Sequence, residues 1–247
     1  MEIQQIRNAT LKIKYGGITF LVDPWLQDKG CGFSAKTIIP EMAGIKNPMI
    51  ELPMQPQKIL QGVDYCIVTH IHPDHFTKDY LPADIKIIVP TVEEKKIIMG
   101  MGFRNVIVFE DMRLKLRDVR ITKTPGIHGD NREIAELMGE VNGYIFEGER
   151  KKLYLAGDTI YYKTIEDILH SIHPEVIILN CCEATVPKGR LIMNLSDVEK
   201  VCKNCPYSTV IATHLDSVNH ALLSSEDIRD FAYAKGLKQI VVPHNGE

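Results

Sequence analysis

The sequence predicts an α/β protein of the α+β kind, with two layers of strands that are each accompanied by helices. Short segments of strand character come first in each half of the chain, and segments with helical periodicity or capping signals lie among the later ones. This order favours two layers over one doubly wound parallel sheet. A chain of 247 residues can bury a full core, so we expect one domain over 1–247.

The chain begins with a predicted β-hairpin. Apolar and polar residues alternate over 10–15, Gly16-Gly17 supplies the positive φ of a two-residue turn, and 18–22 is the return strand. Asp23 stands at the end of this strand, where Pro24 stops ladder pairing. Asp23 either closes a turn or holds a metal-ligating histidine by a hydrogen bond, and the sequence favours neither alternative.

Residues 26–57 are predicted to form a long loop insertion with short helical pieces. This segment shows little periodicity and carries four prolines and three glycines. A loop of this length inside a compact domain is usually functional. Its apolar side chains suit a lid or the wall of a pocket, although packing over the core would explain them equally well.

The rest of the chain alternates between strand and helix signals. Thr91 and Glu94 form a capping box that opens a helix through about Met99. Further helices are expected at about 161–170, from the capping box of Ser196 and Glu199 to about Cys202, and at about 225–235. Strands are expected at 64–69, 85–89, 105–109, 113–117, 119–124, 142–147, 152–156, 175–180, 208–213 and 240–242.

Four of these segments end on or near a histidine or an aspartate. They are the strands at 64–69, 119–124, 152–156 and 208–213. Loops at strand ends are held by a rigid sheet and often carry functional side chains. We therefore expect these four ends to converge on one site.

The strongest functional signal follows the strand at 64–69. His70, His72, Asp74 and His75 place three imidazoles and a carboxylate within six residues. Imidazole nitrogen and carboxylate oxygen are ligands that Zn²⁺ and its neighbours in the Irving–Williams series accept. The stretch is therefore interpreted as part of a metal site.

The ordered set His70-Ile-His72-Pro-Asp74-His75, His128, Gly157-Asp158 and His214 resembles the signature of the metallo-β-lactamase fold superfamily. The resemblance spans residues 70–214. It implies a four-layer αββα sandwich with metals at one edge. Residues 21–25, Leu-Val-Asp-Pro-Trp, also look like the branch that contains ascorbate-6-phosphate lactonase and relatives of N-acylphosphatidylethanolamine phospholipase D.

The resemblance implies two divalent metal ions, with Zn²⁺ expected and Mn²⁺ or Fe²⁺ as alternatives. His70, His72 and His128 would bind the first ion, Asp74, His75 and His214 would bind the second, and Asp158 would bridge them. A hydroxide between the ions would attack a lactone, ester or phosphodiester of a small molecule. Asp74 would be the catalytic residue that orients the water and carries its proton.

Several alternatives remain open at this stage. Asp130 could replace His128 as a ligand, and His220 or His244 could replace His214. His220 and Asn194, both in polar loops near ligand-bearing strand ends, are predicted to contact the substrate. An anionic substrate is one option, since isolated basic residues such as Arg132, Lys188 and Arg190 could bind it.

Other function classes are less well supported. A net charge of −3 without a basic cluster argues against nucleic acid as a partner. No apolar run reaches the length of a membrane span, and six scattered cysteines fit a reducing compartment, so we expect a cytoplasmic protein. A di-iron redox protein of the same fold and a nucleic-acid-processing phosphodiesterase are the alternatives. The resemblance favours hydrolysis over the di-iron branch, which usually has Glu at the position of His72.

Overall fold

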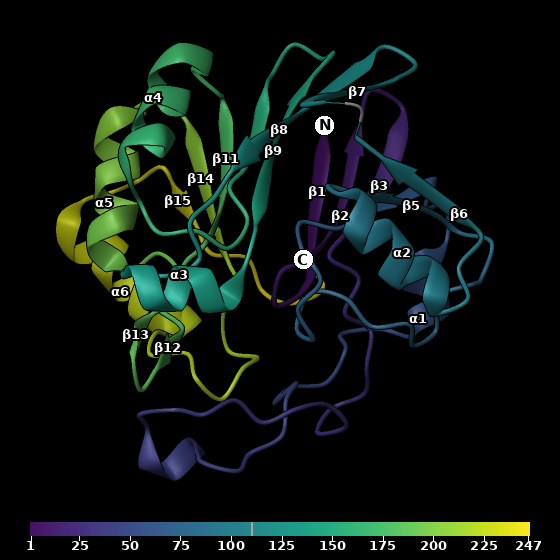
Figure 1. The fold of residues 1–247 in the computed structure, drawn as a ribbon. Coiled ribbons are helices and arrows are strands. Elements are labelled where there is room, and N and C mark those ends of the chain that lie inside the picture. The colour runs from purple at the N-terminus through teal and green to yellow at the C-terminus, as the bar shows by residue number, and fades with distance from the viewer. Residues whose placement is uncertain (110) are drawn as a thin grey trace.

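A computed structural model describes residues 1–109 and 111–247, and its first half forms a six-stranded sheet (Figure 1). The strands lie in chain order, with antiparallel pairing in the first three and parallel pairing from the third onward. They are β1 (Glu2–Arg7), β2 (Thr10–Tyr15), β3 (Ile18–Val22), β4 (Tyr65–Ile67), β5 (Lys86–Val89) and β6 (Asn105–Val108). The hairpin predicted around Gly16-Gly17 is confirmed as β2 and β3.

The second half forms a seven-stranded sheet in the order β15-β14-β11-β10-β9-β8-β7. Its strands are β7 (Arg113–Leu116), β8 (Val119–Pro125), β9 (Asn142–Glu147), β10 (Leu153–Leu155), β11 (Val176–Asn180), β14 (Thr209–Thr213) and β15 (Ile240–Val241). A separate short ribbon pairs β12 (Thr185–Val186) with β13 (Gly189–Arg190). The two sheets confirm the prediction of two layers.

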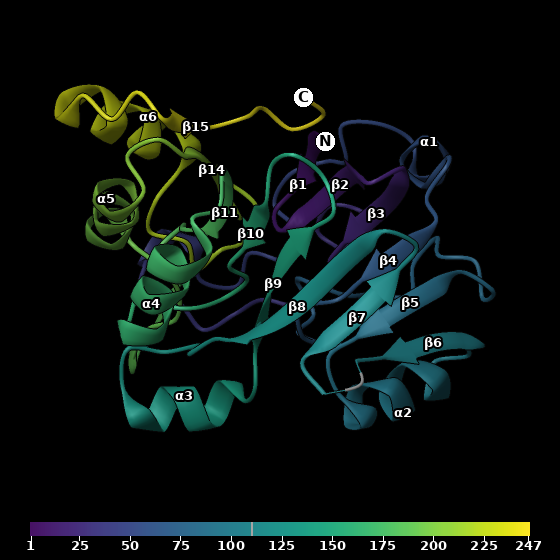
Figure 2. The same cartoon turned by 90° about the horizontal axis from the view of Figure 1, so that it is seen from above.

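Helices cover the outer face of each sheet, as Figure 2 shows from above. The first sheet carries α1 (Pro56–Leu60) and α2 (Val92–Gly100), whose buried Ile59 and Ile98 pack with Cys66 and Ile87. The second sheet carries α3 (Arg132–Met138), α4 (Lys163–Ile172), α5 (Leu195–Asn204) and α6 (Ser225–Lys235). The order helix, sheet, sheet, helix confirms the αββα sandwich.

The central core lies between the two sheets. Ile13 and Phe20 of the first sheet share this core with Tyr144 and Phe146 of the second, and the Phe20 and Phe146 ring centroids are 5.4 Å apart. Because side chains alternate across a strand, Ile67 of β4 points into the central core while its neighbour Cys66 joins the outer one. Both faces of β4 are therefore buried, which fixes the strand that leads into the His-rich loop.

Among the elements that differ from the prediction are β1 and the strand expected at 64–69. Strand β1 was not predicted, because Gln4 and Gln5 interrupt its apolar pattern; its pairing depends on β2 and on the chain end, where Gln5 N donates to Glu247 O at 2.8 Å. The strand expected at 64–69 ends earlier, at Ile67. Thr69 N donates to the Asp23 carboxylate at 2.7 Å instead of to a neighbouring strand, so the ladder stops there.

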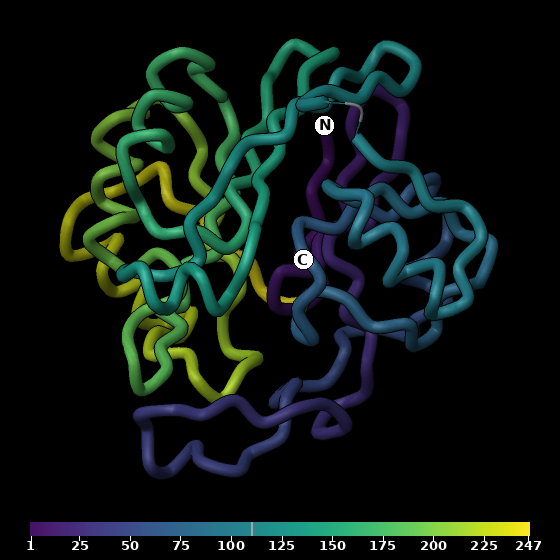
Figure 3. Tube along the Cα trace, in the orientation of Figure 1, coloured from purple at the N-terminus to yellow at the C-terminus, as the bar shows by residue number. Residues whose placement is uncertain are grey.

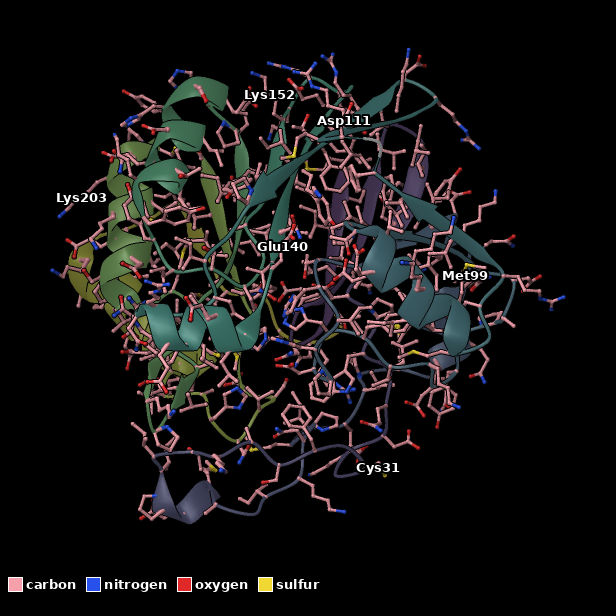
Figure 4. All side chains as sticks on the ribbon, in the orientation of Figure 1. Cys31, Met99, Asp111, Glu140, Lys152 and Lys203 are labelled. Carbon is pink, nitrogen blue, oxygen red and sulfur yellow. The ribbon has the colours of Figure 1, made fainter. Side chains whose placement is uncertain are left out.

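The segment predicted as a loop at 26–57 contains only a 3-10 turn, η1 (Pro40–Met42), and α1. Figure 3 shows its first part, in purple and blue, crossing along the lower edge of the molecule from one half to the other. Cys31, the exposed cysteine of the six, lies on this segment (Figure 4). Among the residues that the structure describes, no helix combines the length and apolar character needed to cross a bilayer.

Candidate metal centre

Four strand ends bring the predicted ligands together. The loop after β4 carries His70, His72, Asp74 and His75, and the ends of β8, β10 and β14 supply His128, Asp158 and His214. All are buried except His72, which is partly exposed. At these ends the backbone turns sharply: Asp23, Gly157 and His214 have φ of 41°, 68° and 65°.

Three groups of side chains have ligand atoms that lie within 4.8 Å of one another. Two of them are separate, His70 with His72 and His128, and Asp74 with His75 and His214, and the third, His70 with His75 and Asp158, joins them. In the first group, His70 Nε2 is 2.9 Å from His72 Nδ1. In the second, His214 Nε2 is 3.2 Å from His75 Nε2 and 3.4 Å from Asp74 Oδ2. Ligand atoms around a tetrahedral Zn²⁺ at 2.0–2.1 Å would be about 3.3 Å apart, so the spacing suits a metal ion.

Asp158 lies between the two groups. Its Oδ2 is 3.2 Å from His75 Nε2, 3.6 Å from His128 Nε2 and 3.8 Å from His214 Nε2. Its other oxygen accepts a 2.6 Å hydrogen bond from Asn180 Nδ2, which orients the carboxylate. One oxygen is thus within reach of both groups, where a bridging ligand would stand.

Asp23 orients two of the histidines. His75 Nδ1 is 2.8 Å from Asp23 Oδ2, which leaves His75 Nε2 facing the centre. Thr69 Oγ1 donates its one proton to the same carboxylate at 2.8 Å, so it can only accept from His70 Nδ1, at 3.0 Å. Asp23 thus contacts His75 and, through Thr69, His70, and its own carbonyl also accepts from Trp25 N at 2.8 Å in a turn.

In two further histidines, His128 and His214, the Nδ1 atom also has a contact away from the centre of the cluster. His128 Nδ1 donates to Leu191 O at 3.1 Å, and His214 Nδ1 lies 3.5 Å from the sulfur of Cys182. Both therefore turn Nε2 toward the carboxylates. Ligating histidines typically hydrogen-bond through the nitrogen that does not touch the metal, so this arrangement is the one that a metal centre requires.

The negative charges of the buried carboxylates in the cluster also favour bound cations. Asp23, Asp74 and Asp158 are at most 7% exposed, and within the described chain their ion-pair partners are histidines alone. Burial opposes protonation of His75, but Asp158 and Asp23 outweigh it and raise the pKa of His75 to about 10. Burial lowers the pKa of His128 to about 4, so this ring is neutral and has a free lone pair at pH 7. Buried carboxylates without Lys or Arg partners need positive charge, which divalent ions would supply.

We expect Asp23→Asn to lower metal affinity by about 10- to 100-fold, because the carboxylate accepts from Thr69 N on Oδ1 and faces His75 and Thr69 Oγ1 with Oδ2, whereas an amide has only one accepting oxygen. Metal titration with a competing chelator measures the effect. Asp64→Asn is the control, since Asp64 accepts from Thr19 N at 2.8 Å and contacts none of the histidines. Equal affinity in the Asp23 variant and the wild type would contradict the assigned role.

A second expected result concerns Gly157, which precedes Asp158. Gly157 and Gly236 have nearly equal φ, 68° and 65°, but a Cβ on Gly157 would lie 2.5 Å from Asn142 O, whereas a Cβ on Gly236 meets nothing within 4 Å. We expect Gly236→Ala to cost about 1–2 kcal/mol from backbone strain alone. Gly157→Ala should cost at least about 2 kcal/mol more in urea unfolding, because the carbonyl must move. Equal losses would show that the strand end has room to adjust.

A cavity of about 210 Å³ opens onto the cluster. Five of the predicted ligands line it, and the other lining side chains are apolar except His220. The apolar ones are Phe33, Ala35, Pro73, Met138, Ala184, Val186 and Leu191. His220 is 5% exposed, and its buried Nδ1 has no hydrogen-bond partner. The structure therefore places His220 at the cavity, where a substrate contact was predicted.

The other candidate residues lie elsewhere. The prediction that Asn194 contacts the substrate is corrected, because Asn194 does not line the cavity. Instead it caps the N-terminus of α5, where its Oδ1 accepts from Asp197 N at 3.1 Å. Asp130 and His244 are exposed and belong to neither group, so the structure selects His128 and His214.

The basic residues considered for anion binding are paired with carboxylates instead: Arg132 with Glu136, Lys188 with Glu133 and Arg190 with Asp197. None of the three lines the cavity.

Several residues of the site were not found from the sequence. Asn180 is the last residue of β11, Cys182 follows that strand, and Thr69 precedes His70, yet each contacts a predicted ligand. A polar residue at the end of a buried strand was the available signal, and it was used only where His or Asp stood there. Phe33 and Ala35 carry no such signal, because only the path of the 26–57 segment brings them to the cavity.

Comparison with known proteins identifies the family. A family model described as the β-lactamase superfamily domain matches residues 19–215, which is most of the chain. The chain belongs to the metallo-β-lactamase superfamily. Within it, the hydrolase is 39% identical over 253 residues to UPF0173 protein YddR of Bacillus subtilis, with 100% of this chain and 98% of the relative covered. More distant relatives carry the name UPF0173 metal-dependent hydrolase, among them one of Ruegeria sp. at 24% identity over 93% of this chain and 92% of the relative.

Two solved structures match the hydrolase over nearly its whole length, both with a TM-score of 0.92. One, from Veillonella parvula, is described as a "possible metal-dependent hydrolase", is 31% identical, and is matched over 99% of this chain and 97% of that one. The other is the isothiocyanate hydrolase from Delia radicum gut bacteria, 33% identical over 100% of this chain and 98% of that one. The predicted class, a metal-dependent hydrolase of the metallo-β-lactamase superfamily, is thus confirmed.

Proposed function

We propose that this hydrolase uses two metal ions, expected to be Zn²⁺, to cleave a small, uncharged substrate that carries an apolar substituent. The observation that carries the proposal is the lining of the 210 Å³ cavity: predicted metal ligands, apolar side chains and His220. Mn²⁺ and Fe²⁺ remain alternatives, because imidazole and carboxylate ligands also accept them. Free cysteines at all six positions support a cytoplasmic location.

The absence of cationic side chains favours an uncharged substrate over an anionic one. No Lys or Arg is among the described residues that line the cavity. A phosphodiester would bring a permanent negative charge next to Asp74 and Asp158, with only the metal ions to compensate it. Of the three predicted substrate classes, the lining therefore favours lactones and esters over phosphodiesters.

The isothiocyanate hydrolase adds a further uncharged class. That relative is 33% identical over the whole chain. An isothiocyanate, R–N=C=S, has an electrophilic carbon like an ester and an R group that apolar walls could hold. Addition of water to this carbon and cleavage of the C–N bond give an amine, R–NH₂, and carbonyl sulfide, which accounts for all atoms. We include isothiocyanates with small apolar R groups among the proposed substrates.

The metal ions, Asp74 and His220 would each have a different role in the reaction. Bound divalent ions would supply Lewis-acid polarisation and ionisation of water at neutral pH. Asp74 lines the cavity, and although burial opposes its ionisation, His214 and His75 hold the pKa of its carboxyl well below the ordinary value. It is therefore ionised and can accept a proton from the attacking water and deliver it to the leaving group. His220 would hydrogen-bond to a heteroatom of the substrate.

The proposal is tested by metal quantitation on the purified protein, followed by a substrate screen with and without chelator. The screen compares aryl esters, lactones and benzyl isothiocyanate with bis(p-nitrophenyl) phosphate. We expect about two metals per chain and turnover that is lost with chelator. The kcat/KM for uncharged substrates should exceed that for the phosphodiester by at least about tenfold, since one unpaired buried charge costs more than about 1.4 kcal/mol. His220→Phe should raise KM more than it lowers kcat.

Four outcomes would overturn parts of the proposal. Preference for the phosphodiester would restore the anionic substrate and, if DNA or RNA were also cleaved, the nucleic-acid-processing phosphodiesterase. Stoichiometric iron with oxidase activity and without hydrolysis would favour the di-iron redox protein. Less than about one metal per chain after reconstitution, or turnover that survives chelation, would remove the metal from the mechanism. Preference for a phosphorylated lactone, which is anionic, would contradict the uncharged substrate and support the narrower branch indicated by residues 21–25.

A further inference from the structure

One wall of the cavity comes from an irregular part of the chain. We call residues 33–47 the wall segment: Phe33 and Ala35 line the cavity, and η1 is the regular structure within it. Much of the segment is exposed, including Lys36 and Lys46. A stretch with so little secondary structure needs other contacts to keep Phe33 and Ala35 in place.

Those contacts converge on Asn219. Its Oδ1 accepts from Ala35 N at 3.1 Å and from Asn47 Nδ2 at 3.0 Å. Its Nδ2 donates to Ala35 O at 2.9 Å and to Met42 O at 3.1 Å, with Ser34 Oγ at 3.4 Å. One side chain from the loop after β14 thus binds the beginning, the middle and the end of the wall segment.

Asn47 completes the arrangement from the other side. Its Oδ1 accepts from Asn219 N at 2.8 Å, and its backbone N donates to Phe33 O at 2.7 Å. Both asparagines are 0% exposed. Removing the Asn219 side chain would take a partner from the partly buried Ala35 N, Ala35 O and Met42 O, and removing that of Asn47 would leave the buried Asn219 N unpaired. An unpaired buried group is costly because water cannot replace the lost partner.

The same contacts set the position of Phe33. Its ring centroid lies 6.5 Å from that of Trp25, the one tryptophan of the chain, which is 0% exposed. Asn219 is followed directly by His220, the polar cavity residue that is not a predicted ligand. Neighbouring residues of one loop therefore hold the apolar wall and present a polar group to the same cavity.

We propose that Asn219 is a positioning residue that fixes the wall segment and thereby sets the size of substrate that the cavity admits. The effect on substrate size rests on the proposed function, whereas the fixing of the wall does not. Loss of the Asn219 amide should free Phe33 and Ala35 from the cavity, so that small substrates bind less well and bulkier ones are excluded less strongly.

The fixing of the wall is tested on the purified full-length protein without a substrate. In the wild type we expect trypsin to cleave slowly after Lys36 and Lys46 although both are exposed. Asn219→Ala should increase cleavage at these sites by about tenfold or more and make Trp25 fluorescence more accessible to acrylamide. Asn204→Ala is the matched control, because Asn204 bonds to Tyr161 and Lys200 away from the cavity.

Circular dichroism establishes that each variant is folded, and Asn219→Ser takes the place of the alanine variant if that one unfolds. Rapid cleavage of the wild type at Lys36 or Lys46 would overturn the proposal, as would unchanged cleavage and quenching in a folded Asn219 variant.

Substrate size is tested with a series of n-alkyl esters or isothiocyanates of increasing length, once one class is turned over. Asn219→Ala should raise KM for the shortest member with a smaller change in kcat, and should flatten the dependence of kcat/KM on length. A parallel fall in kcat for all lengths would assign Asn219 a role in general stability and overturn its role in size selection. If no substrate is turned over, the proposed function fails, while protease and quenching results still decide the role of Asn219 in holding the wall.

Discussion

Asp158→Ala is expected to lower kcat/KM by about 10³-fold or more and to reduce the metal content of the purified protein. Asp158 Oδ2 lies 3.2–3.8 Å from His75, His128 and His214, so its loss removes an oxygen ligand from both groups at once. Several kcal/mol of charge stabilisation depend on correctly held metal ions, and each 1.4 kcal/mol is about a factor of ten in rate. Metal analysis by mass spectrometry and kinetics on the same preparation measure both effects.

A matched control separates ligand loss from local damage. Asn180→Ala removes the 2.6 Å hydrogen bond to Asp158 Oδ1 but keeps the carboxylate, so a loss of only about 10- to 100-fold is expected. Full metal content and near-normal turnover in Asp158→Ala would contradict its position as a bridging ligand. Equal losses in both variants would instead indicate that orientation of the carboxylate matters more than its presence.

Arg7→Met is expected to cost about 3 kcal/mol of unfolding free energy. Arg7 is fully buried on β1, and its guanidinium donates to Ile50 O at 3.1 Å, Trp25 O at 2.9 Å and Gln27 O at 2.7 Å. Its Cζ also lies 5.1 Å from the centroid of the Trp25 ring. Methionine keeps part of the aliphatic packing but leaves the three carbonyl oxygens without donors. These oxygens lie just before the 26–57 segment, near its start and in its second half.

Urea unfolding followed by circular dichroism measures this loss. Arg120→Met is the control, since Arg120 is mostly exposed and lies 3.9 Å from Glu147, and its replacement should change stability by less than about 0.5 kcal/mol. Burial lowers the pKa of Arg7 to about 10, so the desolvation cost of the guanidinium offsets part of its hydrogen bonding. A loss below about 1 kcal/mol would mean that this offset is nearly complete.

The local parts of the fold and the site could be predicted from the sequence. The hairpin around Gly16-Gly17 and the capping box of Thr91 and Glu94 depend on residues close along the chain. The stretch His70 to His75 contains four of the seven candidate ligands in one loop. The resemblance to the superfamily signature then implied His128, Asp158 and His214, while Asp130, His220 and His244 stayed open as alternatives.

Contacts between distant segments could not be predicted in the same way. Asn194 and Asn219 are both polar loop residues, yet one caps a helix and the other binds the wall segment. Both residues are asparagines, and only their hydrogen-bond partners differ. The same holds for Lys188, whose partner Glu133 lies 55 positions away along the chain, whereas Arg132 and its partner Glu136 are only four residues apart on one helix.

Residue patterns by themselves predicted the two layers of strands and the His-rich loop, because strand periodicity and ligand spacing are properties of neighbouring residues. The resemblance of the ordered motif to the metallo-β-lactamase superfamily implied the αββα sandwich and the three later ligands. The tertiary structure decided which polar residues surround those ligands and which side chains form the cavity. Asp23 and Asn180 reach the cluster, and Phe33 and Ala35 reach the cavity, from segments far apart along the chain. Such contacts depend on packing of the two sheets and on the path of the 26–57 segment, which no local pattern records.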